Sequence, residues 1–204
     1  MKTPWESVSL DDYETHMASE QVGQLQALSE IMRRQLLRHA PESVCVLGVA
    51  GGNGLEHIGA GVRKVYGVDI SADYLEVCRQ RFAYFGDRLE LLHADLTDDE
   101  CRLPQTDLVI AALVIEYIGV ETFAQRVDES RPAAICCAVQ RSRGASFVSA
   151  SPAAQALQCL DALHRDVDAD KLAQAMARIG YRQTCREDCP LPNGKELVCL
   201  DFER

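Results

Sequence analysis

The chain has 204 residues, of which 47% are hydrophobic and 25% are charged, a balance typical of a globular protein with one full hydrophobic core. Its formal net charge of −10 disfavours nucleic-acid binding, because the phosphate backbone would be repelled and the densest basic cluster is only the RSR at 141–143. The polar amino terminus does not resemble a signal peptide, and the longest apolar run, at 108–115, is too short to cross a membrane. We therefore expect a cytoplasmic protein without a membrane partner.

Nine cysteines raise the alternatives of disulfides or a metal site. Their number is odd, no C-x-x-C pair occurs, and Cys185 and Cys189 have no second pair with which to complete a zinc site. Most of the others lie in apolar runs, where a free cysteine packs as a small hydrophobic residue. We therefore expect reduced, structural thiols and no metal site.

The amino-terminal part of the chain is expected to contain an irregular segment and one helix. Residues 1–18 include Pro4 and the acidic stretch SLDDYE and look irregular. From Ala18 to about His39, apolar residues recur at spacings of three and four, which is typical of an amphipathic helix. Pro41 ends this helix.

From residue 44 onward, strand-like and helix-like segments alternate. The strand-like segments are 44–49, 64–70, 89–95, 107–113 and 133–139. The helix-like segments are a short one beginning at Leu55, one beginning at Ser71, and the ranges 121–130 and 168–181. This alternation predicts βαβ units and a parallel sheet.

The carboxyl-terminal part departs from that alternation. Asn193-Gly194 lies between two strand-like runs and is a strong signal for a hairpin. We therefore predict an α/β fold with a doubly wound, mostly parallel seven-stranded sheet, a C-terminal antiparallel hairpin and an N-terminal helix.

A glycine-rich segment, VCVLGVAGGNGLEHI at 44–58, connects the first expected strand to the first following helix. Such a turn lets the backbone approach a ligand at the carboxyl edge of a parallel sheet, and nucleotide-like cofactors are its usual occupants. The dinucleotide fingerprint G-x-G-x-x-G is missing, because His57 stands three positions after Gly54 where a glycine is required. The phosphate loop G-x-x-x-x-G-K-[ST] is missing as well.

The segment resembles the first motif of the Rossmann-like (class I) S-adenosylmethionine (SAM)-dependent methyltransferases, an apolar strand and an acid followed by x-G-x-G-x-G. Gly52 and Gly54 match the last two glycines, whereas Gly48 stands in place of the acid and Ala50 in place of the first glycine. The fourth strand, DLVIAALVIEYI, is similar to the family's D-x-V-x-x-x-x-x-L-x-x-I. The amino-terminal PWESVSLDDYETHM resembles a group of small bacterial methyltransferases.

This resemblance implies a cofactor site. Asp69 would accept both ribose hydroxyls, with Ile70 packing on the adenine, and Asp95 would receive the adenine amino group, with Leu96 beside the ring. The alternative for Asp69 is a cap on the following helix, although Ser71 is better placed for that role, and the alternative for Asp95 is a turn residue. The implied SAM site comprises Gly48, Val49, Ala50, Gly52, Gly54, Asp69, Ile70, Asp95, Leu96, Ala112 and Leu113.

The resemblance also implies a division of the chain. Residues 1–204 would form a single methyltransferase domain. Within it, 1–40 would be an N-terminal lid and helix, 41–140 the SAM-binding half, and 141–204 the substrate-side half with the hairpin.

No catalytic constellation stands out in the sequence. The methyl group of SAM is already activated by its sulfonium, so the protein must mainly align a nucleophile and exclude water, and a general base is optional. Tyr13 and His16 lie in a segment that in this fold often folds across the cofactor, and Glu116 and Tyr117 would face the surroundings of the methyl group. The candidates for catalysis are Tyr117, His16 and Tyr13, and the alternative for the last two is a loosely ordered amino terminus.

The sequence predicts transfer of a methyl group to a small molecule, with S-adenosylhomocysteine (SAH) as the second product. The N/D-P-P-Y/F motif of exocyclic-amine methylation is missing, and ALVI occupies its place. The alternative is a SAM- or SAH-binding sensor or scaffold without turnover, which the unusual residues Gly48 and Ala50 favour. A nicotinamide-dependent reductase is opposed by the missing G-x-G-x-x-G and by the lack of a Tyr-x-x-x-Lys pair.

Overall fold

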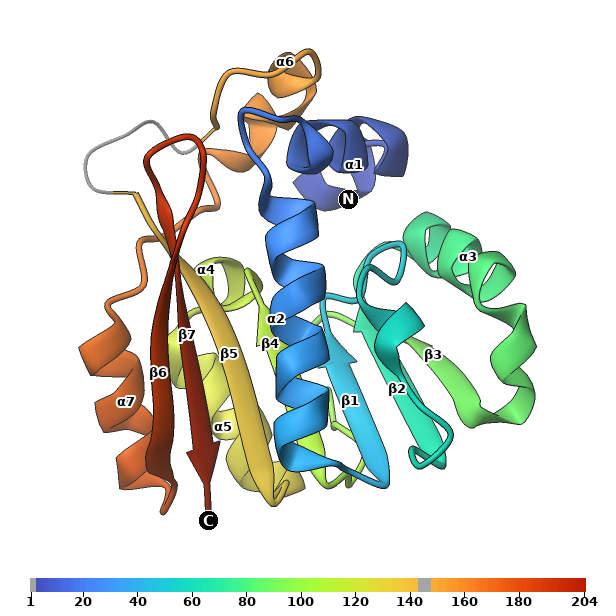
Figure 1. Cartoon of the computed structure of the whole chain (residues 1–204), viewed down its shortest axis with the longest axis vertical. Helices are drawn as coiled ribbons and strands as arrows, with labels where there is room; N and C mark the ends of the chain where they lie inside the picture. The colour runs from blue at the N-terminus through green and yellow to red at the C-terminus, as the bar shows by residue number, and fades with distance from the viewer. Residues whose placement is uncertain (1–2, 143–147) are drawn as a thin grey trace.

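The structure, a computed structural model, describes residues 3–142 and 148–204. In these ranges the chain forms a seven-stranded sheet of order β3-β2-β1-β4-β5-β7-β6 with helices on both faces (Figure 1). The five strands from β3 to β5 in this order are parallel, and β7 is antiparallel to both β5 and β6. The predicted fold class is therefore confirmed. The strands are β1 (Ser43–Leu47), β2 (Lys64–Asp69), β3 (Leu89–His93), β4 (Leu108–Ala112), β5 (Ala134–Arg141), β6 (Arg182–Pro190) and β7 (Glu196–Glu203).

Two layers of helices bury the two faces of the sheet. Helices α2 and α3 cover the face that carries Val44, Val46 and Val65, and helices α5 and α7 cover the face that carries Cys45, Leu47 and Val109. The alternation of faces along β1 follows from the two-residue period of a strand. The helices are α1 (Leu10–Ala18), α2 (Gln24–His39), α3 (Ala72–Arg81), α4 (Ile115–Ile118), α5 (Val120–Ser130), α6 (Ala154–Leu157) and α7 (Ala169–Arg178), and the 3₁₀ turns are η1 (Pro4–Ser7), η2 (Leu55–His57), η3 (Ala83–Arg88) and η4 (Gln158–Leu160).

The amino-terminal segment is regular, so the expectation of an irregular stretch over residues 1–18 was wrong. Helix α1 begins after Ser9, whose side chain accepts a hydrogen bond from the backbone N–H of Asp12 at 3.1 Å. Asp11 and Asp12 lie in its first turn, where negative charge stabilises a helix. Helix α2 begins at Gln24 instead of Ala18, because Gly23 has a left-handed φ of 63° and separates it from α1.

The segment after the glycine loop also differs from the expectation. Only the single 3₁₀ turn η2, Leu55–His57, forms where a short helix was expected. Gly59 and Gly61 follow this turn, and glycine in a helix interior costs about 1 kcal/mol relative to alanine. The chain therefore passes quickly from the loop into β2.

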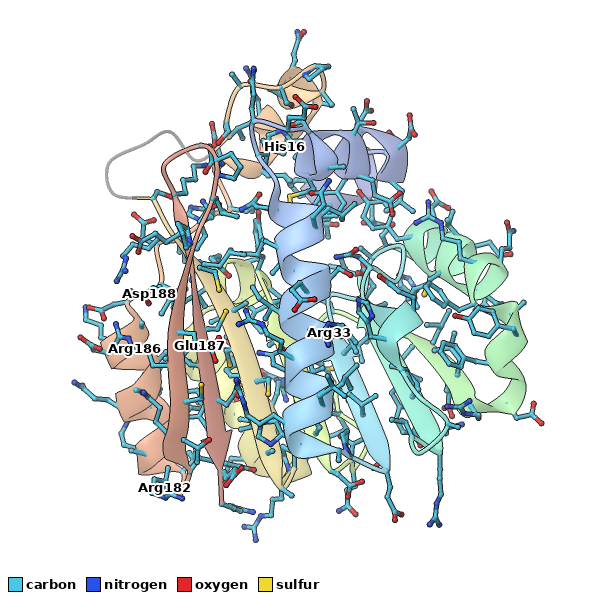
Figure 2. The ribbon with its side chains drawn as sticks, in the orientation of Figure 1. His16, Arg33, Arg182, Arg186, Glu187 and Asp188 are labelled. Carbon is cyan, nitrogen blue, oxygen red and sulfur yellow. The ribbon has the colours of Figure 1, made fainter. Side chains whose placement is uncertain are left out.

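The C-terminal hairpin forms the edge of the sheet and turns at Gly194, whose φ is 78°. Its outer strand β6 carries the charged residues Arg182, Arg186, Glu187 and Asp188 (Figure 2). Charge on an edge strand disfavours pairing with the edge of another sheet. Asn193 accepts a hydrogen bond from the backbone N–H of Lys195 at 3.1 Å and so supports the turn.

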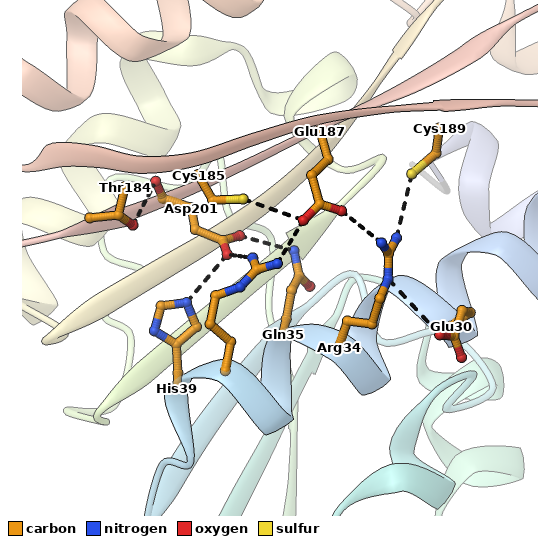
Figure 3. Close-up of polar contacts among 10 residues, drawn as sticks. Glu30, Arg34, Gln35, His39, Thr184, Cys185, Glu187, Cys189 and Asp201 are labelled. Carbon is orange, nitrogen blue, oxygen red and sulfur yellow. Dashed lines mark hydrogen bonds and ion pairs between the residues drawn. The ribbon is translucent and has the colours of Figure 1, made fainter.

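An ionic network ties α2 to this hairpin (Figure 3). Arg38 pairs with the carboxylate of Asp201, which is 1% exposed, and also with Glu187, 2.7 Å away. Possible metal-ligand atoms of His39, Cys136 and Asp201 lie within 4.8 Å of one another. The guanidinium of Arg38 already neutralises this carboxylate, so the cluster is accounted for as an ion pair.

Two further observations bear on the class of protein. All nine cysteines are free thiols. Within the described residues, none of the helices has both the length and the apolar character that crossing a bilayer requires.

Candidate functional site

A cavity of about 260 Å³ lies at the carboxyl edge of the parallel sheet, where α1 and the amino terminus cover the strand ends (Figure 1). Each strand from β1 to β4 ends at this cavity, so residues far apart in sequence meet there. Eight of the eleven residues of the implied SAM site line it. These are Gly48, Ala50, Asp69, Ile70, Asp95, Leu96, Ala112 and Leu113.

The other three residues of the implied site, Val49, Gly52 and Gly54, are not among those that line the cavity. A Cβ on Gly52 would lie 2.4 Å from the ring of Phe82, and a Cβ on Gly54 would lie 2.6 Å from Sδ of Met32. Val49 is buried in the core beside α2 and α3. In this structure these positions therefore serve the packing of the loop.

Asp69 is the acidic group at the centre of the cavity's strand edge. It is 9% exposed, and its two carboxylate oxygens accept hydrogen bonds from the backbone N–H groups of Ala50 at 2.8 Å and Ser71 at 2.9 Å. Burial raises the pKa of this carboxyl group, and the backbone N–H groups of Ser71, Ala50 and Ile70 oppose the rise. Because each carboxylate oxygen has two lone pairs, one on each remains for a ligand hydroxyl.

The sequence left open whether Asp69 binds a ligand or caps the following helix. Ser71 caps α3, since its hydroxyl accepts a hydrogen bond from the backbone N–H of Tyr74 at 3.3 Å. Asp69 orients the residue that caps the helix and also faces the cavity. The cap thus leaves Asp69 able to bind a ligand.

The backbone of the cavity edge is unusual. Gly48, Ala50 and Leu113 all have left-handed φ angles, of 66°, 47° and 55°. Such conformations are costly for residues other than glycine and cluster at functional sites. A Cβ at Gly48 would lie 3.3 Å from Val114, so the loop lies close against the end of β4.

Asp95 follows β3 and combines a turn with a side chain at the cavity. One of its oxygens, Oδ1, accepts hydrogen bonds from the backbone N–H of Thr97 at 2.8 Å and from the Thr97 hydroxyl at 2.7 Å. The other oxygen, Oδ2, has no hydrogen-bond partner among residues 3–142 and 148–204. The turn role and a ligand role are therefore compatible for this residue.

Aromatic side chains from the amino terminus form the cover of the cavity. The ring of Trp5 meets the rings of Tyr13 and Tyr117 edge to face, at centroid distances of 5.8 Å and 4.9 Å. Tyr13 also stacks on Tyr74 at 6.3 Å. The hydroxyl of Tyr74 donates to the carbonyl of Val8 at 2.8 Å and so fixes the segment between η1 and α1.

A second cavity, of about 40 Å³, adjoins the first. The two share Trp5, Tyr13, Leu113 and Tyr117 as lining residues, and the smaller one is also lined by His16, Glu116, Gln140 and His164. His16 lies on α1 at the carboxyl-edge end of the sheet (Figure 2). The structure thus brings all three candidate catalytic residues, Tyr13, His16 and Tyr117, to one place.

The environment limits what these three residues can do. Burial raises the pKa of Tyr13 and of Tyr117, so both hydroxyl groups stay protonated near neutral pH and can donate hydrogen bonds. Burial and the nearby Lys195 lower the pKa of His16, so its imidazole is neutral there. Its Nδ1 lies 2.7 Å from Oγ of Ser151.

Glu116, which the sequence placed near the methyl group but not among the three catalytic candidates, lines the smaller cavity. Its Oε1 accepts a hydrogen bond from the backbone N–H of Gln140 at 2.7 Å, and the residue is 1% exposed. Burial raises the pKa of Glu116 to about 7. The signal in the sequence was an acid inside the apolar run LVIEYI, where a carboxylate needs a partner or a function.

Comparison with known proteins gives a match to one domain family over part of the chain, and a fold. Residues 44–133 match the sequence profile of the methyltransferase domain family, whereas no curated protein matches the chain. A magnesium protoporphyrin IX methyltransferase from Synechocystis PCC 6803, solved with bound SAH, superposes with a TM-score of 0.73 at 14% identity, over 98% of this chain and 95% of that one. The profile and the fold confirm the resemblance that the first motif indicated.

Two other solved structures have the same fold. The N-methyltransferase NodS from Bradyrhizobium japonicum WM9, solved with SAH, has a TM-score of 0.65 at 12% identity, over 96% of this chain and 97% of that one. The [4+2]-cyclase SpnF has a TM-score of 0.67 at 9% identity, over 88% of this chain and 82% of that one. Because one of these proteins is a cyclase, the fold alone does not define the reaction.

Proposed function

We propose that this chain is a class I methyltransferase enzyme and that it transfers the methyl group of SAM to a small-molecule acceptor. The proposal is carried by Asp69, a buried carboxylate held by two backbone N–H groups at the carboxyl edge of the sheet, with one lone pair left on each oxygen. Two hydroxyls on adjacent carbons, as in a ribose, match these two acceptors.

The residues around Asp69 fit the rest of SAM. Apolar Ile70 and Leu96 lie at the cavity beside Asp95, whose Oδ2 is available to accept the hydrogen bond of an amino group. Ala112 and Leu113, at the end of β4, would lie along the methionine part. Gly48 leaves room for the backbone to approach, because it has no Cβ against Val114.

When bound, SAM supplies a methyl group already activated by a positively charged sulfur. The chain then has to hold the acceptor in line and keep water out. Trp5, Tyr13 and Tyr117 cover the site with apolar rings. Tyr13 and Tyr117 would donate hydrogen bonds to the acceptor, and His16 would help to position it from the smaller cavity.

A small acceptor is favoured by the geometry and by the charge. The smaller cavity has a volume of about 40 Å³ and lies under the amino-terminal cover, so it suits only the reactive end of a compact molecule. The formal charge of −10 opposes a nucleic-acid substrate. In the proposed division, residues 1–40 act as the lid, 41–140 bind SAM, and 141–204 help to form the acceptor side.

The first test is a thermal-shift titration with SAM, SAH, NAD and NADP side by side. A ligand at about 100 times its dissociation constant should stabilise the protein by roughly 2.7 kcal/mol. Stabilisation by SAM and SAH, with none from NAD or NADP, is expected. No shift with SAM or SAH would contradict the proposed site.

Release of SAH from SAM in the presence of small acceptors separates an enzyme from the alternative of a SAM-binding sensor. An enzyme forms SAH only when an acceptor is present. A sensor could bind SAM as tightly as an enzyme does, but it would form no SAH with any acceptor.

A further inference from the structure

Among the described residues, a buried carboxylate oxygen in the smaller cavity has no hydrogen-bond partner. Oε1 of Glu116 accepts a hydrogen bond from Gln140, but Oε2 is buried and makes no hydrogen bond with any described residue. An unsatisfied buried oxygen costs more on a charged carboxylate than on a neutral group, so such an oxygen in a native protein calls for a bound ligand, an ordered water or a role in a reaction. Glu116 lies in α4, shortly after the end of β4, which borders the larger cavity where SAM is proposed to bind (the SAM cavity).

We propose that Glu116 is the general base of methyl transfer and that the acceptor is a small, mostly apolar alcohol or phenol whose hydroxyl binds to Oε2. This proposal rests on the proposed function and names the acceptor class for the same site. The position supports it: Tyr117, the next residue, and Leu113 line both cavities. An acceptor in the smaller cavity would therefore lie between Glu116 and the SAM cavity.

The proposed acceptor class follows from which nucleophiles need a general base for methyl transfer. An amine attacks through its lone pair and can lose its proton afterwards, and a thiol readily ionises before it attacks. A hydroxyl group is a poor nucleophile until its proton leaves, so it is the acceptor that benefits from a base within hydrogen-bond reach. Apolar side chains from Trp5, Leu157 and Leu160 line the same cavity and suit the carbon atoms next to the hydroxyl of such a molecule.

The tyrosines and histidines around Glu116 are less suited than Glu116 to act as a general base near neutral pH. The pKa of each tyrosine is raised by burial, so both stay protonated, and the pKa of each histidine is lowered by burial. Burial and the charge of Asp166 raise the pKa of Glu116 to about 7, which is near the value that suits a general base. The groups that face Glu116 are Tyr13, His16, Tyr117, Cys137, His164 and Asp166.

Methyl transfer with Glu116 as the base needs no reactant besides SAM and the acceptor. The acceptor oxygen forms a bond to the methyl carbon, and its proton passes to Oε2 of Glu116. The bond between that carbon and the sulfonium sulfur breaks, and its electron pair stays on sulfur, which becomes the neutral thioether of SAH. Glu116 ends protonated and returns its proton to water when the product leaves.

The test compares Glu116→Gln with wild type, and with Glu30→Gln as a control at an exposed carboxylate that pairs with Arg33. Thermal shift with SAM and SAH is measured first, because failure of the wild type to bind them would contradict the proposed function and not the role of Glu116. SAH release is then measured with phenol and benzyl alcohol as hydroxyl probes, aniline as an amine probe and thiophenol as a thiol probe.

Glu116→Gln is expected to bind SAM like wild type and to lose about 10²–10⁴-fold in turnover of a hydroxyl probe. Its turnover of thiophenol should stay within about threefold, because a thiolate needs no base. Glu30→Gln should match wild type throughout. An equal loss with all probes, no loss with any probe, or a SAM-binding wild type that methylates neither phenol nor benzyl alcohol would overturn the proposal.

A second readout does not depend on turnover. In protein labelled with ¹³C at glutamate carboxyl groups, one resonance should titrate near pH 7 and be missing from Glu116→Gln. Addition of phenol to the SAH complex should shift this resonance. A Glu116 resonance that phenol leaves unchanged, in a complex that binds phenol, would contradict contact between Oε2 and the hydroxyl.

Discussion

The backbone N–H of Ala50 donates a hydrogen bond to Oδ2 of Asp69 at 2.8 Å, which joins the loop after β1 to the last residue of β2. A second donor, the N–H of Ser71 at 2.9 Å, holds the other oxygen. The side chain of Asp69 is therefore fixed before any ligand arrives. Preorganisation of this kind reduces the entropy lost on binding.

Asp69→Ala is expected to weaken SAM binding by about 10–100-fold, since hydrogen bonds to a charged group contribute roughly 1.5–3 kcal/mol. The change also removes the acceptor for two backbone N–H groups, so the free energy of unfolding should fall by about 1–3 kcal/mol. Isothermal titration calorimetry measures the first effect, and urea unfolding without SAM measures the second. Asp73→Ala, at an exposed position in the first turn of α3, serves as the control and should bind SAM normally. Wild-type affinity in Asp69→Ala would exclude the ribose contact.

Ala50→Gly is expected to stabilise the protein by about 0.5–1 kcal/mol, because Ala50 has a φ of 47° and glycine adopts this conformation without the steric cost of a Cβ. Gly48→Ala should have the opposite effect on stability, since Gly48 has a φ of 66° and the new Cβ would lie 3.3 Å from Val114. It should destabilise the protein by about 1 kcal/mol or more. Urea unfolding of the two variants compares them directly. If Ala50→Gly lowered the free energy of unfolding, Ala50 would have to be stabilised by a contact that glycine cannot make.

The sequence was sufficient for the succession of strands and helices along the chain and for the acidic residues at the carboxyl edge of the sheet. Continuous apolar runs predicted β1 and β4, and Asn193-Gly194 predicted the hairpin, because these signals are local. The ends of successive parallel strands necessarily meet at one edge, so Asp69 and Asp95 could be placed together before the structure was known.

Other features depend on residues distant in sequence and could not be predicted. Whether a loop glycine faces a ligand or packs against the protein is decided by Phe82, in the turn after α3, and by Met32, in α2, which approach Gly52 and Gly54 respectively. The smaller cavity likewise forms where α1, α4 and η4 meet, and these elements are far apart in the sequence. Helix α1 was missed because it is short and acidic, although Ser9 followed by two acids is a recognisable start signal.

Trp5 provides a direct probe of the cover, because it is the one tryptophan in the sequence. Binding of SAH beside its ring should change the intensity or the maximum of its fluorescence, with saturation at the affinity measured by calorimetry. Trp5→Ala removes the ring contacts with Tyr13 and Tyr117, each of which contributes roughly 0.5–1.5 kcal/mol. We therefore expect SAH to dissociate about 10-fold faster from this variant in a competition experiment with labelled SAM.

Trp5→Phe keeps an aromatic ring and is the matched control for the cover. It should retain a dissociation rate closer to that of wild type. Tryptophan fluorescence that does not respond to saturating SAH would show that the amino-terminal segment is not the cover of the occupied site.

The buried carboxyl group of Glu116 also makes stability depend on pH. Burial raises its pKa from 4.5 to about 7, so between these values the unfolded chain is ionised and the folded chain stays protonated. The free energy of unfolding therefore falls as the pH rises through this window, by on the order of 2–3 kcal/mol from this group. Glu116→Gln removes that dependence and keeps an acceptor for the N–H of Gln140. It should be more stable than wild type by on the order of 2 kcal/mol at about pH 8, and equal to it near pH 4.

Urea unfolding of the SAM-free proteins at several pH values checks this expectation. The difference between variant and wild type is the quantity to compare, because other carboxyl groups contribute equally to both curves. Glu30→Gln, at an exposed residue paired with Arg33, should show no such pH-dependent difference. A constant difference between Glu116→Gln and wild type across the window would mean that Glu116 ionises in the folded protein as it does in the unfolded chain. A variant that gains stability and loses hydroxyl methylation would show that the same buried charge lowers stability and serves the reaction.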